Sequence, residues 1–462
     1  MRKPRVAVLG NPGTGKTYFG LFLLVQCIRN ESTVIYESAS IDELYLFSAG
    51  GITVFASRKD PSFRSAIGKR STIYIVDGMV PVQANARTIL VTSPKHEIYH
   101  DFATKRTAPA VALYMPTWSL AELTTLREAV FPSVDQGDME DLIVRWGGIP
   151  RAVMEDAAAN KLSWESKDED TLQAAIGSCS INDLVETVKE GSERFQMSHR
   201  VLHVQCSTTF RKKGYMFASE YVRDRVLRRL VQQERHRLLQ FATFADGTSM
   251  NGGLRGQVFE YFAHAWLASD TKVFDIRPLN APALSVTTAP TTITWNRLSI
   301  HLFHKGQFPT RPLSALTYLQ PESRNFAAVD AIISVALDEP ALLFQMAVGA
   351  SHPISAVRLN ELLNSIRPVS ALFFVVPCDR YHSYTQQSYY DLEGHTVTPS
   401  AQVAALPQYA LCIDLVEETL REALEAASAA EPATEEPAAE SKGRKRKAGT
   451  LSGGRKRKAK WA

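Results

Sequence analysis

One short segment constrains this chain more than any other. Residues 10–17 read Gly-Asn-Pro-Gly-Thr-Gly-Lys-Thr and stand between an apolar run at 6–9 and a helical run at 18–28. The segment matches the pattern G-x-x-x-x-G-K-[ST], whose glycines let backbone N–H groups curl around phosphate oxygens. The order strand, loop, helix also brings the positive end of a helix dipole to the phosphates. The sequence therefore predicts a site for a nucleoside triphosphate, either ATP or GTP.

The residues of this loop have distinct expected roles. Lys16 should reach the β- and γ-phosphates, and the Thr17 hydroxyl should bind Mg²⁺. The expected nucleotide contacts within the loop are Gly10, Asn11, Pro12, Gly13, Thr14, Gly15, Lys16 and Thr17.

A second acidic residue is expected at the end of a neighbouring strand, where it would hold Mg²⁺ through water. Asp77 follows the apolar run 72–76 and is the candidate for this catalytic and metal-binding role, although an aspartate that opens a turn is the alternative. Many ATPases carry a glutamate directly after this aspartate, and that glutamate polarises the attacking water. This chain has Gly78 there. Nucleotide binding is therefore better supported than rapid hydrolysis, and turnover stays open.

Two further positions are candidates for contact with the nucleotide. Thr92 and Ser93 follow the next apolar strand and could lie near the γ-phosphate, unless they only form a strand-end turn. Arg151 follows Gly-Gly-Ile-Pro at 147–150, which makes a sharp loop before a helix. Arg151 could therefore point at phosphate charge, or it could be a surface arginine.

The alternation of short apolar strands with helical stretches predicts an α/β fold with a parallel sheet. The expected strands of the first region are residues 5–9, 33–36, 73–76, 88–92 and 110–114. The most apolar stretch, 19–28, is too short to cross a membrane and should be a buried helix. The expected regions are a nucleotide-binding domain (1–160), a helical extension (161–247), a second α/β domain (248–425) and a disordered tail (426–462).

Within the helical extension, residues 221–240 should form an amphipathic helix with many arginines, which either face solvent or touch nucleic acid. The five cysteines are scattered without a Cys-x-x-Cys pair, so free thiols are expected rather than disulfides or zinc. A cleavable signal peptide would remove part of the glycine-rich loop and is not expected.

Positive charge is concentrated in the tail. Residues from 431 onward hold ten Lys/Arg and four Glu, which leaves 42 basic and 44 acidic residues in the rest of the chain. The tail has basic clusters at 442–447 and 455–460, which indicate binding to a nuclear import receptor or to nucleic acid. A solubilising tail is the alternative. The folded part carries no general excess of positive charge for binding nucleic acid.

Together these motifs resemble a known family, the Crinkler effectors of oomycetes and fungi and the related retrotransposon-hot-spot proteins of trypanosomes. The resemblance lies in residues 10–17, 74–78, 91–94, 114–119, 122–123 and 145–151. It implies a P-loop NTPase of the AAA/STAND type fused to a restriction-endonuclease-like domain. It also implies action in a nucleus, with host proteins and nucleic acid as partners. Crinklers usually begin with a small ubiquitin-like trafficking header, which is not seen before residue 5, so delivery into a host is less supported than nuclear location.

The resemblance also assigns candidate residues in the second domain. A restriction-type nuclease carries an acid on a first helix, an aspartate on one strand and a Glu/Gln-x-Lys on the next, which together hold the catalytic Mg²⁺. The resemblance implies Glu260, Asp330 and Gln345 as catalytic residues, with Glu260 and Asp330 as metal ligands. Ala347 stands in the lysine position, and His352 is a substitute base or a structural histidine.

Two functions follow from these expectations. In the first, a nuclear NTPase controls a nuclease-like domain that acts on DNA or chromatin and is degenerate as a nuclease. In the second, a nucleotide-binding protein that does not hydrolyse its ligand regulates nuclear or host proteins. Gly78 and Ala347 favour the second, whereas Lys16, Thr17 and Asp77 keep the first open.

Overall fold

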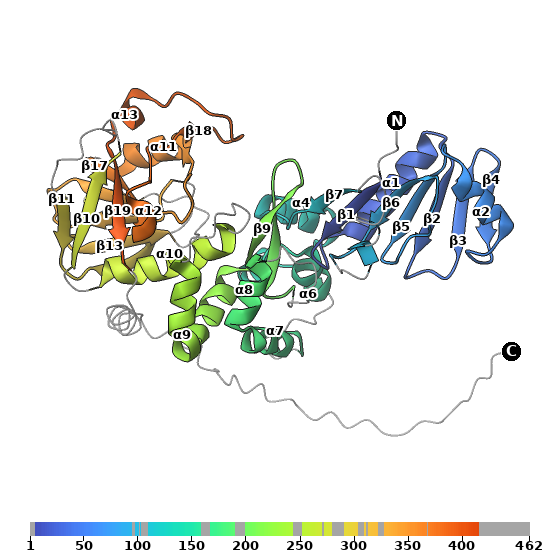
Figure 1. Cartoon of the computed structure of the whole chain (residues 1–462), viewed down its shortest axis with the longest axis horizontal. Coiled ribbons are helices and arrows are strands. Elements are labelled where there is room, and N and C mark those ends of the chain that lie inside the picture. Colours follow the sequence, from blue (N-terminus) through green and yellow to red (C-terminus); the bar gives the residue numbers. More distant parts are fainter. Residues whose placement is uncertain are drawn as a thin grey trace, which may run out of the picture.

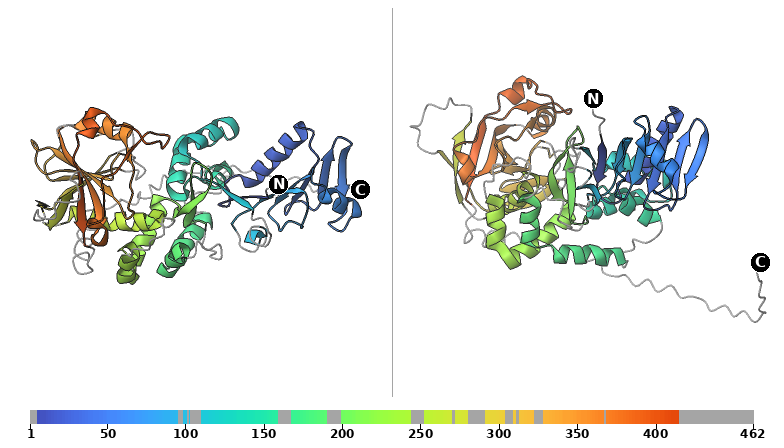
Figure 2. Two further views of the ribbon diagram at one scale, coloured as in Figure 1. Left: turned by 45° about the horizontal axis from the view of Figure 1, so that its top comes forward. Right: turned by 45° about the vertical axis from the view of Figure 1, so that its right-hand side comes forward.

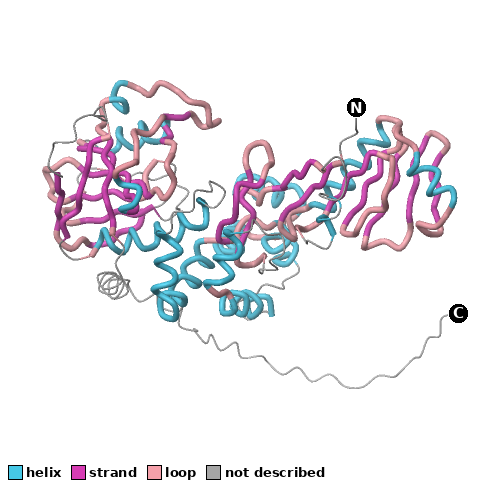
Figure 3. Tube along the Cα trace, viewed as in Figure 1, coloured by secondary structure: helices cyan, strands magenta, loops and turns pink. Residues whose placement is uncertain are grey.

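The computed structural model describes residues 5–94, 98–100, 102, 110–158, 167–189, 199–243, 252–269, 272–279, 291–303, 309–310, 313–321, 328–366 and 368–414. Two large β-sheets lie at opposite ends of the molecule, and a mostly helical region lies between them (Figures 1 and 3). The expected disordered tail with its basic clusters lies outside the described residues. Within the described residues, no helix has both the length and the apolar character needed to cross a membrane.

The N-terminal sheet has the strand order β4-β3-β2-β5-β6-β1-β7. Five of its strands run parallel and are the five expected from the sequence, with small shifts at their ends. They are β1 (Val6–Gly10), β2 (Val34–Ser38), β5 (Ile73–Asp77), β6 (Arg87–Val91) and β7 (Val111–Met115). Their nearly continuous apolar sequences are typical of parallel strands that are buried on both faces.

The far edge of this sheet is an antiparallel hairpin that was not predicted from the sequence. It consists of β3 (Leu44–Ser48) and β4 (Gly51–Phe55). Aromatic and β-branched residues flank a turn at 49–50, and this pattern was the available signal. Helix α1 (Lys16–Arg29) packs on one face of the sheet and α2 (Pro61–Gly68) on the other.

The central region is mainly helical, and its helices begin well before residue 161, where the helical extension was expected to start. Between α8 and α9 the chain also forms an antiparallel hairpin that was not predicted. The elements are α4 (Leu120–Val130), α5 (Gln136–Trp146), the π-helix η1 (Arg151–Glu155), α6 (Asp156–Ala158), α7 (Lys167–Ser178), α8 (Ile181–Lys189), β8 (Leu202–Cys206), β9 (Lys212–Phe217) and α9 (Glu220–Thr243).

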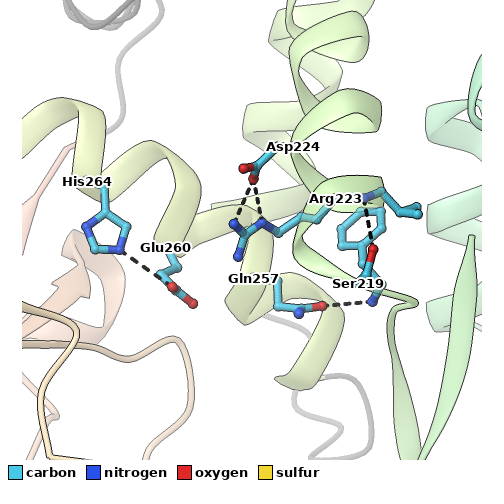
Figure 4. Close-up of polar contacts among 8 residues, drawn as sticks. Ser219, Arg223, Asp224, Gln257, Glu260 and His264 are labelled. Carbon is cyan, nitrogen blue, oxygen red and sulfur yellow. Dashed lines mark hydrogen bonds and ion pairs between the residues drawn. The ribbon is translucent and has the colours of Figure 1, made fainter. Parts of the chain in front are cut away.

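The expected arginine-rich helix is α9, and several of its arginines bind residues of the same chain. The buried Arg223 donates to Asp224 at 2.7 Å (Figure 4). Arg229 donates to the carbonyl oxygen of Cys179, which lies just before α8. Arg225 lies over the ring of Tyr221, 4.6 Å from its centre. These contacts give the arginines a structural role.

Helix α10 (Gly252–Ala268) begins the C-terminal region. Buried residues of α9, α10 and the C-terminal sheet, such as Leu230, Phe259 and Phe344, form one continuous core. The helices α9 and α10 and the C-terminal sheet therefore share one core. The expected border between a helical extension and a second domain at 247/248 lies outside the described residues.

The C-terminal sheet has the order β11-β10-β19-β17-β15-β14-β13-β12. Strands β13, β14 and β15 pair antiparallel, and β15 continues through α11 to β17, which is parallel to it. Its elements are β10 (Lys272–Pro278), β11 (Thr291–Trp295), β12 (Ser299–Phe303), β13 (Thr317–Pro321), β14 (Ala331–Ser334), β15 (Ala341–Met346), α11 (Ala356–Ile366), β17 (Val369–Pro377) and β19 (Gln408–Ile413).

The prediction that all cysteines are free thiols is wrong for two of them. Cys378 and Cys412 form a disulfide, with 5.1 Å between their Cα atoms. They are distant in sequence, but the parallel pairing of β17 with β19 places Val376 opposite Cys412 and so brings Cys378 to its side. A sequence spacing rule cannot detect such a pair, because strand pairing alone creates the contact. The other three cysteines are free.

Candidate nucleotide-binding site

The glycine-rich loop joins β1 to α1 at the carboxyl edge of the N-terminal sheet (Figure 1). Lys16 is buried, and its ammonium group donates a hydrogen bond of 2.6 Å to the carbonyl oxygen of Asn11. The hydroxyl of the buried Thr14 donates to the same oxygen at 2.9 Å. The loop therefore curls around its own lysine and holds it at the start of the helix.

A second segment packs directly on the loop. The backbone N–H of Arg151 donates to the carbonyl oxygen of Gly13 at 3.3 Å. Gly13 has a φ of +82°, and a Cβ there would lie 2.8 Å from Ile149 and 3.0 Å from the Cβ of Arg151. Only glycine fits both this left-handed backbone and this close approach. The Gly-Gly-Ile-Pro-Arg segment thus lies against the loop.

Trp118 forms a hydrogen bond with each of these two segments. Its indole N–H donates to the carbonyl oxygen of Thr14 at 3.1 Å, and its backbone N–H donates to the carbonyl oxygen of Gly148 at 2.8 Å. A Cβ on Gly148 would overlap the carbonyl oxygen of Trp118. In the sequence, Trp118 stood out only as part of a motif shared with the family, and its contact with the loop was not predicted.

Two positive charges meet at this site. Burial, and to a smaller extent the charge of Arg151, lower the pKa of Lys16 to about 8, while the charge of Asp77 opposes this shift. Three residues from separate parts of the sequence are therefore close enough to interact electrostatically. Arg151 is mostly exposed, and its guanidinium group lies 3.6 Å from the carboxylate of Glu155. Two neighbouring cations at a helix N-terminus create an environment that favours an anion.

Asp77 ends β5 and is buried on the side of the sheet that α1 covers. The hydroxyl of Ser38, at the end of β2, donates to its carboxylate at 3.3 Å and lies 2.9 Å from the hydroxyl of Ser40. Burial and the charge of Asp77 raise the pKa of Tyr36. Ser38 was not predicted from the sequence; the signal was a polar residue that follows the apolar run of β2.

The remaining candidates lie around the same strand ends. Thr92 directly follows β6, the strand between β1 and β5, and is buried, with its N–H bonded to the carbonyl oxygen of Val8 at 3.0 Å. Ser93 is partly exposed beside it. Thr17 lies in the first turn of α1 with its side chain exposed. The structure thus brings together the loop, Asp77, Thr92 and Arg151.

Glu37 does not substitute for the catalytic glutamate that many ATPases carry at the position of Gly78. Its carboxylate is buried on the opposite face of the sheet, where Arg58 donates to it at 2.5 Å and the Tyr74 hydroxyl also donates to it. Burial and the hydrogen bond to Glu37 raise the pKa of Tyr74. This carboxylate is therefore held by two structural partners and faces away from the loop.

The hairpin of β8 and β9 connects the loop to the C-terminal region. The Asn11 side-chain oxygen accepts the backbone N–H of Val204 at 3.3 Å, and its amide nitrogen is buried without a hydrogen-bond partner among the described residues. On the other strand, the N–H of Phe217 donates to the side-chain oxygen of Gln257 at 2.9 Å. Gln257 lies on α10 (Figure 4). Gln257 lies one helical turn before Glu260.

The candidate residues of the second domain are only partly brought together. The register of β14 and β15 places Ala331 opposite Phe344, so Asp330 and Gln345 are neighbours. Asp330 accepts the N–H of Met346 at 2.7 Å, and the Gln345 amide donates to the carbonyl oxygen of Ala328 at 2.9 Å. The expected segment 321–325 before Asp330 falls largely outside the described residues.

Glu260 lies on α10, 3.5 Å from His264 (Figure 4). The other ring nitrogen of His264 is 2.6 Å from the Tyr318 hydroxyl. Burial lowers the pKa of His352, and the charge of Glu260 opposes this shift, so these two residues are also close. Ala347, which the resemblance sets in the lysine position, is buried. In the described parts of the chain, no three His, Cys, Asp or Glu side chains are grouped to hold a metal ion.

The N-terminal region is thus an α/β unit with a glycine-rich loop of the G-x-x-x-x-G-K-[ST] type. No protein-family model matches the chain. Over 391 residues, 82% of its length, it is 25% identical to Crinkler effector protein 15 of Phytophthora infestans. It is 24% identical to Crinkler effector protein 16 of the same organism over an equal span. The chain spans 60% of the length of each relative.

A solved structure, the RuvB Holliday junction branch migration motor of Thermotoga maritima, matches 50% of this chain and 70% of its own. The identity is 12% and the TM-score 0.24, which is too low to indicate a shared fold. The resemblance to Crinkler effectors inferred from the motifs agrees with the two relatives; the fusion to a nuclease-like domain is not tested by them.

The contact of Trp118 with Gly148 gives a prediction about stability. We expect Gly148→Ala to lower the free energy of unfolding by about 3 kcal/mol, because the new methyl group would overlap Trp118 and displace it from the loop. Gly68→Ala is the matched control, since a Cβ there meets open space, and should be neutral or slightly stabilising. Urea denaturation measures both; equal effects of the two changes would contradict this account of the packing.

Proposed function

We propose that this chain binds a nucleoside triphosphate with Mg²⁺ at the loop 10–17. The observation that supports this most is the convergence of Lys16 and Arg151 at the N-terminus of α1, with Asp77 beside them. A triphosphate would interact with both cations, and the loop amides would donate to its oxygens. Gly10, Asn11, Pro12, Gly13, Thr14 and Gly15 would line it through the backbone.

The residues present fit Mg²⁺ at this site. The metal prefers oxygen ligands and keeps several of its waters, and the Thr17 hydroxyl and the Asp77 carboxylate supply such oxygens. When bound, the ion would neutralise phosphate charge. Ser38, which is hydrogen-bonded to Asp77, would orient that carboxylate. Thr92 would lie near the terminal phosphate.

Hydrolysis should be slow. Gly78 supplies no carboxylate to polarise water, and Glu37 is held on the opposite face by Arg58 and Tyr74. The site therefore favours a bound state that persists, as in a nucleotide-dependent switch. The route for such a switch would be the β8–β9 hairpin, which contacts Asn11 at one end and Gln257 at the other.

We also propose that the C-terminal region derives from a restriction-type nuclease but does not cleave DNA. Support for the ancestry is the order β13-β14-β15-β17, with α10 before it and α11 as the crossover. Support for lost cleavage is Ala347, together with the structural hydrogen bonds of Gln345 and Asp330.

The biological setting follows from the relatives and the tail. The matched proteins are named Crinkler effectors. Together with the basic clusters at 442–447 and 455–460, this supports a nuclear protein that binds an import receptor, and then nucleic acid or host proteins. Contacts of these clusters with DNA phosphates would be sensitive to salt and blind to sequence.

Nucleotide binding is tested by isothermal titration calorimetry with ATP and GTP. We expect Lys16→Ala to weaken binding roughly 100-fold, about 3 kcal/mol, because it removes a charged hydrogen-bond donor to the phosphates. Arg64→Ala changes an exposed arginine on α2 and should leave affinity unchanged. Unchanged affinity in a folded Lys16→Ala protein would exclude this site.

Binding should also depend on pH in a defined direction. The pKa of Lys16 is lowered to about 8 in the free chain. A bound polyanion favours the charged ammonium and raises this pKa, so nucleotide binding takes up protons above about pH 8. We expect affinity to be constant below pH 8 and to fall by up to about tenfold per unit above it. Calorimetry in buffers of different ionisation enthalpy measures the uptake; its absence would contradict the burial of this lysine.

The absence of cleavage gives a separate prediction for the C-terminal region. Supercoiled plasmid incubated with the full chain and Mg²⁺ should stay intact, with or without ATP, and Asp330→Ala should behave identically. Nicking by the unmodified chain that disappears in Asp330→Ala would show an active nuclease instead. Nucleotide binding by the same Asp330→Ala protein controls for correct folding.

A further inference from the structure

The outer side of α1 is unusual for a surface helix. Between Lys16 and Arg29 the helix contains no charged residue. Its solvent side carries a stripe at helical spacing, with Tyr18 70%, Phe22 56% and Val25 44% exposed, and with Leu21 and Ile28 beside them. A helix that is apolar on all sides is normally buried. The sequence indeed predicts a buried helix here, but in the single chain only its inner side is covered.

A second apolar surface lies next to it on the sheet. Ile52 is 67% and Val54 is 54% exposed on the edge strand β4. Pairing places Ile52 opposite Phe47 and Val54 opposite Tyr45, so all four side chains share one face of the hairpin. This surface of β3 and β4 is named the platform.

The platform lies on the same side of the sheet as α1. Phe47 pairs with Val34, which packs under α1 together with Leu24. Helix α2 packs on the other face, with Phe63 beside Phe55. Among the described residues, α1 is the helix that covers this side, and it lies over the central strands rather than over β3 and β4 (Figures 1 and 2). In the part of the chain that the structure describes, the platform lies beside α1 without a helix over it.

We propose that a second copy of this chain covers this surface, with α1 of each copy lying on the platform of the other. A two-fold axis would place the two α1 helices side by side between the two sheets. Each platform would then be covered by a helix, and the exposed side of each α1 would be buried. Sheets of this type are normally covered by helices on both faces, and the exchanged α1 supplies the missing cover.

The size and chemistry of the surface fit this partner. The exposed side chains of α1 and β4 present roughly 700 Å², close to the ~800 Å² that one partner contributes to a standard interface. None of these side chains is charged, so two identical surfaces meet without like-charge repulsion. Strand β4 contains no charged residue or proline of the kind that protects exposed edges in monomers.

The oligomeric state of the full chain tests the proposal. Sedimentation velocity at micromolar concentration should show a dimer for the unmodified chain. Phe22→Glu and Val54→Glu should each shift it to monomer, because a charge would be buried without a partner. The matched control is Leu392→Glu, another exposed apolar position far from the platform in sequence, which should stay dimeric.

A second experiment, in which two variants are mixed, distinguishes loss of this interface from a variant that is monomeric because it is misfolded. Phe22→Lys and Val54→Glu are each expected to be monomeric alone. Mixed together they should form a heterodimer, because the ammonium group introduced on α1 of one copy would face the carboxylate introduced on the platform of the other. A monomeric unmodified chain would overturn the proposal. A dimer insensitive to both substitutions, or a mixture that stays monomeric, would overturn it as well.

Discussion

The N-terminal region depends on the electrostatic environment of one buried lysine. Lys16 donates a hydrogen bond to the carbonyl oxygen of Asn11 inside the glycine-rich loop. A second cation, Arg151, and a carboxylate, Asp77, lie close enough to influence its charge. Burial and the nearby second cation both disfavour the charged form of the lysine and so lower its pKa. An anion with several oxygens would relieve that repulsion. The packing of Trp118 and Gly148 against the loop maintains this arrangement.

The same loop is tied to the rest of the molecule through the side chain of Asn11. Asn11 contacts the β8–β9 hairpin, and the hairpin in turn contacts α10 through Gln257. Because α9, α10 and the C-terminal sheet share one core, a change at the loop would be transmitted to a well-packed body rather than to a flexible linker. This continuity is the route that the proposed nucleotide-dependent switch would use.

Local signals in the sequence predicted the loop, the five parallel strands and the residues around the loop. Glycine spacing, apolar runs and polar residues at strand ends are properties of short segments, so Lys16, Asp77 and Thr92 could be chosen as candidate site residues before the fold was known. The hairpins β3–β4 and β8–β9 were missed although each pairs neighbouring segments of the sequence. The disulfide between Cys378 and Cys412 was missed because the pairing of β17 with β19, and no sequence spacing, creates the contact. The roles of Ser38 and Trp118 arise from contacts between segments that no sequence spacing records.

The central claim is that backbone N–H groups of the loop bind phosphate oxygens. Amide hydrogen exchange of peptides covering residues 10–17, followed with and without ATP and Mg²⁺, tests it directly. The account predicts slower exchange at Gly13, Gly15 and Lys16 on addition of nucleotide, with little change in α2. Equal exchange in the loop at saturating nucleotide would contradict it.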